Sequence, residues 1–314
     1  SSIDDIAIIN NRITDVDGSA YIRNNDPSGA GNGIQIQFGG TVDNTVDDVS
    51  ISRNLISGVT TADTKGRTLA IGINVLPRGN NITRLNITEN SITGLEPGAS
   101  ESEEEVRGIS IDTQVTKSGS EEFEGGTDDS NGVVNAPVIA GNNIGDFSGN
   151  ASSPFEAAGI TFFGDNAGNT DIGVNNFKIT SNTIENITNA GGPSSTVLIG
   201  GEYSDLGDDH QVTNNNLVGS GIVRYSTSTP DTDDALNATS NWWGSANGPN
   251  ADANTYNNAS QGGYVSGSVE FTPWLDNSTD NGGTEFAPVT NGSDDGFSNI
   301  QAAIDASSDE TVDL

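Results

Sequence analysis

The residues of this sequence that could bind a metal ion are carboxylates and amides in polar stretches. Asp165, Asn169 and Asp171 alternate with other residues and offer the oxygen ligands that Ca²⁺ prefers. Glutamates also gather at 101–105 and 121–124. No stretch matches the calcium loop of an EF-hand, and charge runs usually form solvated faces. We expect no required cofactor, with Ca²⁺ as a candidate ligand of Asp165, Asn169 and Asp171 that calorimetric titration in high salt would test.

Residues suited to nucleophilic or acid–base catalysis are scarce. The chain has no cysteine, which excludes thiolate chemistry and disulfides. Its one histidine, His210, takes an inward position of a predicted strand and has no nucleophile beside it, so a structural role is favoured. Trp243 and Trp274 are expected to pack inside, whereas Trp242 points outward and is the candidate for stacking on a sugar.

The charge balance limits the possible partners and the setting. With 44 acidic and 11 basic residues the net charge is −33, which makes the folded chain repel itself at low salt. At about 1 M salt the screening length falls to about 3 Å. Because the acids are scattered, we interpret the chain as halophilic, with an ordinary acidic secreted protein as the alternative. Because the acidic surface repels phosphate, nucleic acid is not expected as a partner. The sequence contains no run of about 18 apolar residues, so no membrane insertion is predicted.

Glycosylation sequons support an extracellular or cell-surface location, although a chain rich in Asn, Ser and Thr contains some by chance. We predict glycosylation at Asn81, Asn86, Asn150, Asn186, Asn237, Asn258, Asn277 and Asn291.

A repeat centred on asparagine organises the chain. Two alternating apolar residues precede each asparagine and two more follow it, as in Leu85-Asn-Ile87 before Asn90, then Ile92 and Leu95. A second alternating segment lies between successive copies, for example at 108–111. The intervals between the asparagines run from 26 to 52 residues around a constant core, and the last two copies are weaker. The repeated asparagines are Asn11, Asn54, Asn90, Asn142, Asn182, Asn215 and Asn241.

This repeat predicts an all-β fold, a single-stranded right-handed parallel β-helix of about seven coils. Asparagine tolerates a left-handed backbone at a bend, and asparagines stacked about 4.8 Å apart form amide-to-amide hydrogen bonds. Stacked coils build a continuous core from few apolar residues, which fits the hydrophobic fraction of 32%. The alternative, an antiparallel sandwich, predicts regular hairpin turns but no asparagine at a fixed phase.

Two segments carry a resemblance to a known family. Residues 237–249, with Asn241-Trp-Trp-Gly-Ser-Ala-Asn-Gly-Pro249, and residues 265–275 resemble the closing coil of right-handed parallel β-helix repeats with a pectate-lyase-like fold. Such repeats occur in secreted surface proteins of haloarchaea and bacteria. Residues 295–306 resemble the opening cap of the same repeats. The resemblance implies the fold for nearly the whole chain and says little about function.

The C-terminal segment pairs a short amphipathic helix with a strand. Ser298 to Gln301 fits a capping box, and the apolar residues Phe297, Ile300 and Ile304 share one helical face before a strand with Val312 and Leu314. We therefore divide the chain into a β-helix (1–275), a polar linker (276–293) and a helix–strand cap (294–314). The first coil, which contains Ile3 and Ile6, is expected to lack a cover of its own.

An uncovered coil exposes strand edges and core. We expect the cap segment to complete the first coil of a neighbour, across a junction between copies or within tandem repeats. Such a head-to-tail contact builds a filament. An arbitrarily excised segment and a cap that folds back on its own chain are the alternatives.

The outward positions of the repeat argue against an enzyme. Polysaccharide hydrolysis needs two carboxylates near the scissile bond. None of the outward residues that we assign is an acid, so we predict a structural subunit of a surface fibre or adhesin. Its expected partner is another copy of the same chain, and surface glycans are further candidate partners. A carbohydrate-binding or carbohydrate-cleaving protein is the alternative. The assigned positions are Ala7, Ser50, Asn86, Val138, Lys178, Gln211, Asn237, Arg12, Leu55, Ser91, Asn143, Thr183, Asn216, Trp242, Gln35, Gly72, Ser110 and Thr161.

Overall fold

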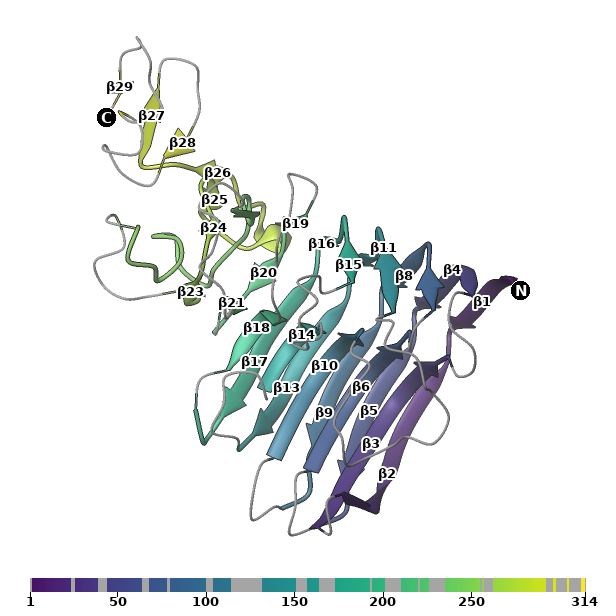
Figure 1. Ribbon diagram of the computed structural model, residues 1–314. Helices are drawn as coiled ribbons and strands as arrows, with labels where there is room; N and C mark the ends of the chain where they lie inside the picture. The colour runs from purple at the N-terminus through teal and green to yellow at the C-terminus, as the bar shows by residue number, and fades with distance from the viewer. Residues whose placement is uncertain are drawn as a thin grey trace.

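The computed structural model describes a stack of parallel strands (Figure 1). The described residues are 2–23, 26–38, 44–63, 68–77, 80–99, 104–113, 132–150, 157–163, 173–192, 194–200, 210–219, 221–225, 235–254, 256, 262–291, 296–297, 304 and 312–313. Three faces of parallel strands, here called sheets A, B and C, surround one apolar core. The fold is therefore a parallel β-helix, as the repeat predicts.

Sheet A contains the strands that precede each repeated asparagine. Every pair in it is parallel and in register, and Ile8, Ile51, Ile87 and Ile139 form one column from coil to coil. Its strands are β1 (Ser2–Ile9), β4 (Thr45–Ser52), β7 (Asn81–Ile82), β8 (Leu85–Thr88), β11 (Val133–Asn135), β12 (Val138–Ala140), β15 (Val174–Asn175), β16 (Lys178–Thr180), β19 (Gln211–Thr213), β22 (Leu236–Asn237) and β24 (Val269–Glu270).

Sheet B begins directly after each repeated asparagine. Its inward column contains Ile13, Ile56, Ile92, Ile144 and Ile184. The strands are β2 (Arg12–Arg23), β5 (Leu55–Thr61), β9 (Ser91–Glu96), β13 (Asn143–Gly149), β17 (Thr183–Asn189) and β20 (Asn216–Leu217).

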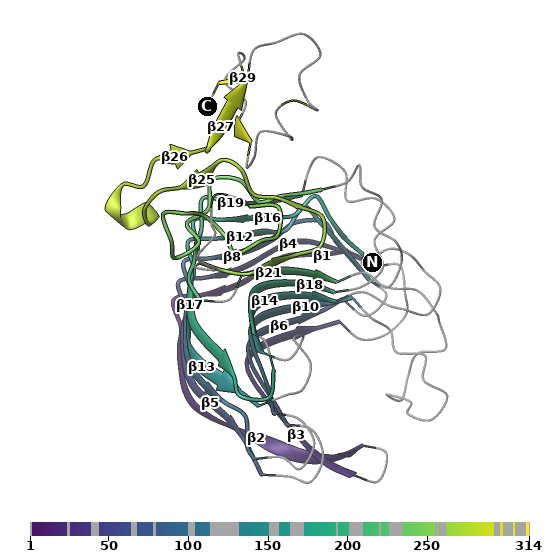
Figure 2. The same cartoon turned by 90° about the vertical axis from the view of Figure 1, so that its left-hand side faces the viewer.

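Sheet C closes each coil and lies opposite sheet B when the molecule is viewed along the stack (Figure 2). In the first coil the ends of β2 and β3 pair antiparallel, Ser19–Arg23 with Asp26–Ala30, and this hairpin joins sheets B and C. The strands are β3 (Asp26–Gln37), β6 (Thr68–Leu76), β10 (Glu104–Asp112), β14 (Ala157–Phe163), β18 (Ser195–Gly200), β21 (Ile222–Tyr225) and β23 (Val265–Ser266).

A column of glycines sets the distance between sheets B and C. A Cβ atom on Gly108 would lie 2.4 Å from the Cγ2 atom of Ile144 in sheet B and 2.5 Å from the backbone oxygen of Gly159 in the next coil. Gly33, Gly72 and Gly159 have the same environment, each against one isoleucine of sheet B. No other residue fits at this distance, so the glycines allow two sheets to approach across a thin core.

This column corrects one expected orientation. The sequence pattern places Gly72 outward and Ile71 inward, yet Gly72 faces the Cγ2 atom of Ile92 across the core. Ile71 instead shares an outward row with Arg107 and Ala158, and it is buried there. The strand turns at each glycine, so Gly108 and Ile109 both face inward, and simple alternation fails at that point.

The chain ends in smaller antiparallel units. Strands β25 (Trp274–Leu275) and β26 (Glu285–Phe286) form a hairpin around the 3-10 helix η1 (Thr279–Asn281). Strand β27 (Val289–Asn291) pairs antiparallel with both β28 (Gly296–Phe297) and β29 (Val312–Asp313). The second unit extends from the end of the rod opposite β1 (Figure 1). Strand β29 lies where the sequence predicts the terminal strand. Of the residues assigned to the helical face, Ile304 is helical, whereas Phe297 lies in strand β28, contrary to the prediction.

The glycine column predicts a stability effect. Replacing Gly108 with valine inserts a side chain where even one Cβ atom overlaps Ile144 and a backbone oxygen. We expect unfolding free energy to fall by about 3 kcal/mol or more, the upper range for overpacked cores. Denaturant titration in molar salt measures the change, with Lys178→Ala on the exposed face of β16 as the control. Equal midpoints for the two variants would contradict the close approach of the sheets.

Candidate functional site

The repeated asparagines form one continuous ladder of side-chain amides. The Nδ2 atom of Asn11 donates to the Oδ1 atom of Asn54 at 2.9 Å, and the same bond recurs in five further links of 2.9–3.0 Å as far as Asn241. From Asn54 to Asn241 each residue is at most 1% exposed. The predicted amide-to-amide stacking is confirmed.

Each ladder amide also satisfies the backbone around it. The backbone N–H of Asn90 donates to the Oδ1 atom of Asn142 at 2.9 Å, and the Nδ2 atom of Asn90 donates to the carbonyl of Ile51 at 2.9 Å. Asn142 and Asn182 repeat both contacts with their own neighbours. A buried corner of the coil thus keeps its polar groups paired, which buried backbone requires.

The left-handed backbone at this corner belongs to the residue before each asparagine, contrary to the expectation that the asparagine adopts it. Asn10, Arg53, Glu89 and Ser181 have φ between 54° and 59°. The backbone bends at the preceding residue because the asparagine side chain must point into the buried ladder. The bend residue points to solvent, which explains why its type varies along the chain.

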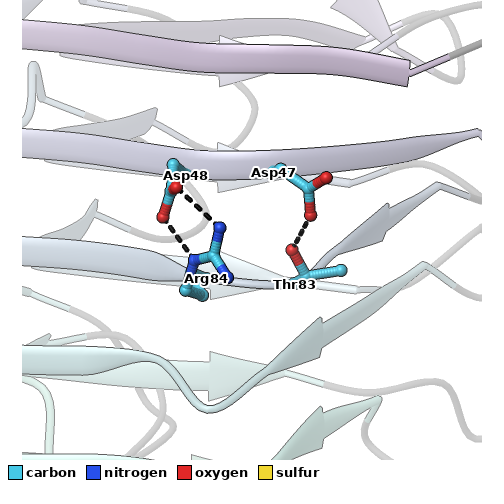
Figure 3. Close-up of polar contacts among 4 residues, drawn as sticks. All are labelled: Asp47, Asp48, Thr83 and Arg84. Atoms are coloured by element: carbon cyan, nitrogen blue, oxygen red, sulfur yellow. Dashed lines mark hydrogen bonds and ion pairs between the residues drawn. The ribbon is translucent and has the colours of Figure 1, made fainter.

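A charged pair lies at another corner, between the second and third coils (Figure 3). The Arg84 guanidinium holds the Asp48 carboxylate through two hydrogen bonds, one of them 2.6 Å from Nη2 to Oδ2, and this contact lowers the pKa of Asp48 and raises that of Arg84. The Thr83 hydroxyl donates to Asp47. The Asp48–Arg84 pair is exposed, and screening by salt makes it a weak contributor to stability.

Sheet C carries an outward carboxylate that the sequence pattern misses. Glu105 and Arg107 flank the inward Val106 on β10 and form an ion pair of 2.7 Å, with Glu105 1% exposed. From the sequence, Glu105 is expected in a loop before the strand, and no acid is therefore expected on the outward face of sheet C. The neighbouring Ser110 is fully buried, and its hydroxyl has no hydrogen-bond partner among the described residues. The outward face of sheet C is therefore buried, and beside these polar groups it carries an apolar cluster of Ala158, Leu198 and Val223.

The histidine and tryptophans lie where the sequence places them. His210 is buried, its Nε2 atom lies 3.1 Å from the backbone nitrogen of Asn176, and its ring packs edge-on against Phe177. Trp243 and Trp274 are fully buried. Trp242 is half-buried beside Asn216.

The predicted sites for metal and glycans fall partly outside the described residues. Asp165, Asn169 and Asp171 lie outside them, and within the described residues no cluster of three or more acids or histidines is able to hold a metal ion. Asn258 also lies outside, and only the backbone of Asn291 is described. Of the remaining sequons, Asn81, Asn150, Asn186 and Asn277 are exposed, and Asn86 and Asn237 are half-buried.

The residues predicted to mediate assembly lie at opposite ends of the rod. Ile3 and Ile6 are in β1, where Ile6 is only partly buried against the core. At the other end Phe297 is half-buried in β28, and Ile304 is 50% exposed. Val312 is in β29, described by its backbone, whereas Ile300 and Leu314 lie outside the described residues.

A shallow groove of about 550 Å³ runs along the ends of sheet B. Glu96 and Glu104 line it together with hydroxyl and amide groups of Ser148, Asn150 and Thr188. Such a mixture of donors and acceptors suits a hydroxyl-rich ligand, although no aromatic ring lines the groove.

Comparison with known proteins adds no relative. No protein family, no curated protein and no solved structure matches this chain. No helix among the described residues is long and apolar enough to cross a membrane. Function must therefore be inferred from the geometry of this chain.

The ladder predicts a difference between its middle and its open end. Replacing Asn142 with leucine removes its own hydrogen bonds and leaves the buried backbone N–H of Asn90, and one of the two hydrogens on its Nδ2 atom, without an acceptor. We expect a loss of about 3 kcal/mol or more in unfolding free energy, because each buried group left unpaired costs about 1–3 kcal/mol. Asn11→Leu, at the exposed end, should cost less than about 1 kcal/mol. Denaturant titrations that give equal losses would contradict a cooperative buried ladder.

Burial raises the pKa of Glu270, at the end of sheet A. A raised pKa in the folded state stabilises the protein below the unfolded pKa, and this contribution disappears as pH rises through the folded pKa. Glu270→Gln should therefore melt higher than the unsubstituted protein at pH 7, and this difference should disappear as pH falls toward the ordinary pKa of glutamate. The gain is less than about 1 kcal/mol because the side chain is partly exposed. Thermal melts with Glu96→Gln as control measure it, and a gain that persists at pH 4 would contradict this assignment.

Proposed function

We propose that this protein is a structural subunit of an extracellular or cell-surface fibre, in which the C-terminal segment of one copy covers the first coil of the next. The observation that carries the proposal is the open first coil. Support comes from its unpaired strand edges, from the different construction of the opposite end and from the position of the C-terminal strands.

The first coil presents strand edges with no described partner. Strands β1, β2 and β3 pair with β4, β5 and β6 of the second coil, and no described strand runs along the other edge of β1. Ile6, Ile8, Ile13 and Val16 are only partly buried, whereas the equivalent residues of the second coil are fully buried. Free edges beside exposed core favour the addition of another chain.

The opposite end of the rod is closed. Trp243 and Trp274 fill the end of the core, and the Nε1 atom of Trp274 donates to the carbonyl of Ala246 at 3.1 Å. Phe286 of β26 packs against Trp274 with ring centroids 5.5 Å apart. Since the two ends differ, two copies joined end to end meet through different surfaces, and such contacts repeat without closing.

The C-terminal strands suit the open coil as a partner. Strand β29 pairs with β27 along one edge and with no described strand along the other, and the exposed side chain of Ile304 lies in the same segment. This unit extends from the closed end, away from β1 (Figure 1). We assign residues 294–314 as the cover for β1 of a second copy. The scattered negative charge fits assembly in concentrated salt, where self-repulsion is screened.

Deletion of residues 294–314 tests the fibre. We expect the full chain to form long fibres in molar salt and the deletion variant to remain monomeric, as measured by electron microscopy and sedimentation. Circular dichroism of the deletion variant checks that the β-helix remains folded. Monomers of the full chain, or fibres that survive the deletion, would overturn the proposal.

Carbohydrate binding is the second candidate function, and the polar groove along sheet B supports it. A binding role predicts that Glu96→Gln weakens the affinity for neutral and acidic oligosaccharides in calorimetric titration. The truncated chain should bind as the full chain does, because the groove lies within the β-helix.

A further inference from the structure

We infer that the open first coil accepts a partner only in a head-to-tail arrangement, through a segment that donates a hydrogen bond to the Oδ1 atom of Asn11. The inference rests on the proposed function for its occupant, the C-terminal segment of a second copy. It adds the chemistry of the contact and excludes pairing between two open coils.

The asparagine ladder has a direction. The Oδ1 atom of Asn54 accepts two hydrogen bonds from the coil before it, from the backbone nitrogen and the Nδ2 atom of Asn11, both at 2.9 Å. The Oδ1 atoms of the next five ladder residues each accept the same two bonds from the preceding asparagine, at 2.9–3.0 Å. All six amide groups therefore point their oxygen atoms toward the first coil, and aligned hydrogen bonds of this kind reinforce one another.

Among the described residues the ladder starts at Asn11, and the side-chain oxygen of Asn11 is an unused acceptor there. Asn11 is exposed, and its Nδ2 atom donates to Asn54 and to the carbonyl of Ile9. Its Oδ1 atom accepts no hydrogen bond from the described part of the chain. Covering the coil would bury this oxygen, and a buried acceptor without a donor is unfavourable. The covering segment must therefore supply a donor at this position.

Two open coils placed face to face would not meet this requirement. A two-fold contact whose axis passes beside Asn11 would oppose the Oδ1 atoms of two Asn11 residues, neither of which has a remaining side-chain donor. It would also bring together the exposed carboxylates of Asp5, Asp15 and Asp17 from each copy, and Arg12 is the one cation of this coil whose side chain is described as exposed. Like charges and paired acceptors disfavour a closed dimer. The contact is therefore between unlike surfaces.

Single cysteines test the arrangement, because the chain has no cysteine of its own. Ala7→Cys is placed at an exposed position on β1, and Asp313→Cys lies on β29. Under mild oxidation in molar salt we expect disulfide-linked dimers from the mixture of these two variants and none from Ala7→Cys alone. Lys178→Cys, on the exposed face of β16, measures random collision. Linked dimers of Ala7→Cys above that background would overturn the inference.

Asn11→Leu tests the donor requirement. We expect head-to-tail association to weaken about tenfold, as for the loss of one net hydrogen bond, while the unfolding midpoint changes much less than in Asn142→Leu. Asn10→Gly is the matched control, since glycine keeps the left-handed bend (φ 59° at Asn10) and leaves Asn11 intact. Association of Asn11→Leu as tight as that of Asn10→Gly overturns the inference and leaves the fibre standing. A full chain that remains monomeric overturns both.

Discussion

Hydrogen bonding inside the buried corner of each coil is the constraint on which the rest of the structure depends. Between sheets A and B the chain must turn sharply within the core, where backbone groups have no access to water. The ladder from Asn11 to Asn241 solves this once per coil with a single side chain that donates, accepts and repeats at the spacing of the strands. Because the coils are thereby held in phase, the aliphatic columns of sheets A and B coincide from coil to coil. The regular stacking of the three sheets follows from that phase.

The sequence predicts those parts of the fold that repeat at a fixed phase. The asparagines and the aliphatic residues around them, such as Ile87 and Ile92, identify sheets A and B and their register, because a residue that must stack recurs at the same position of every coil. His210, Trp243 and Trp274 also lie as their phase indicates. A local signal was sufficient because it indicates which side of the strand a residue occupies, although the contacts made there, such as that of His210 with Asn176, come from other coils.

Other features depend on contacts that the local pattern does not contain. Gly72 and Gly108 face isoleucines of another coil across the core, and only the three-dimensional distance between sheets reveals why glycine is needed there. Glu105 reads as a loop acid because it follows a run of charge, and its place on β10 beside Arg107 depends on pairing with β6 and β14. The unused acceptor of Asn11 likewise has no sequence signal, since Asn11 matches the other ladder residues in every local respect.

The ladder has a consequence for how such a chain changes over evolutionary time. Because every coil presents the same acceptor on one side and the same donors on the other, a whole coil is an interchangeable part. Duplicating or losing one would lengthen or shorten the rod, and the remaining links of the ladder would still form. Loss of a single residue between an asparagine and the apolar residue two places on would instead shift the alternation of the following strand by one position. Its apolar side chains would then face solvent instead of the core. The unequal intervals between the asparagines are compatible with such a history, in which length varies freely outside the stacked segments and hardly at all within them.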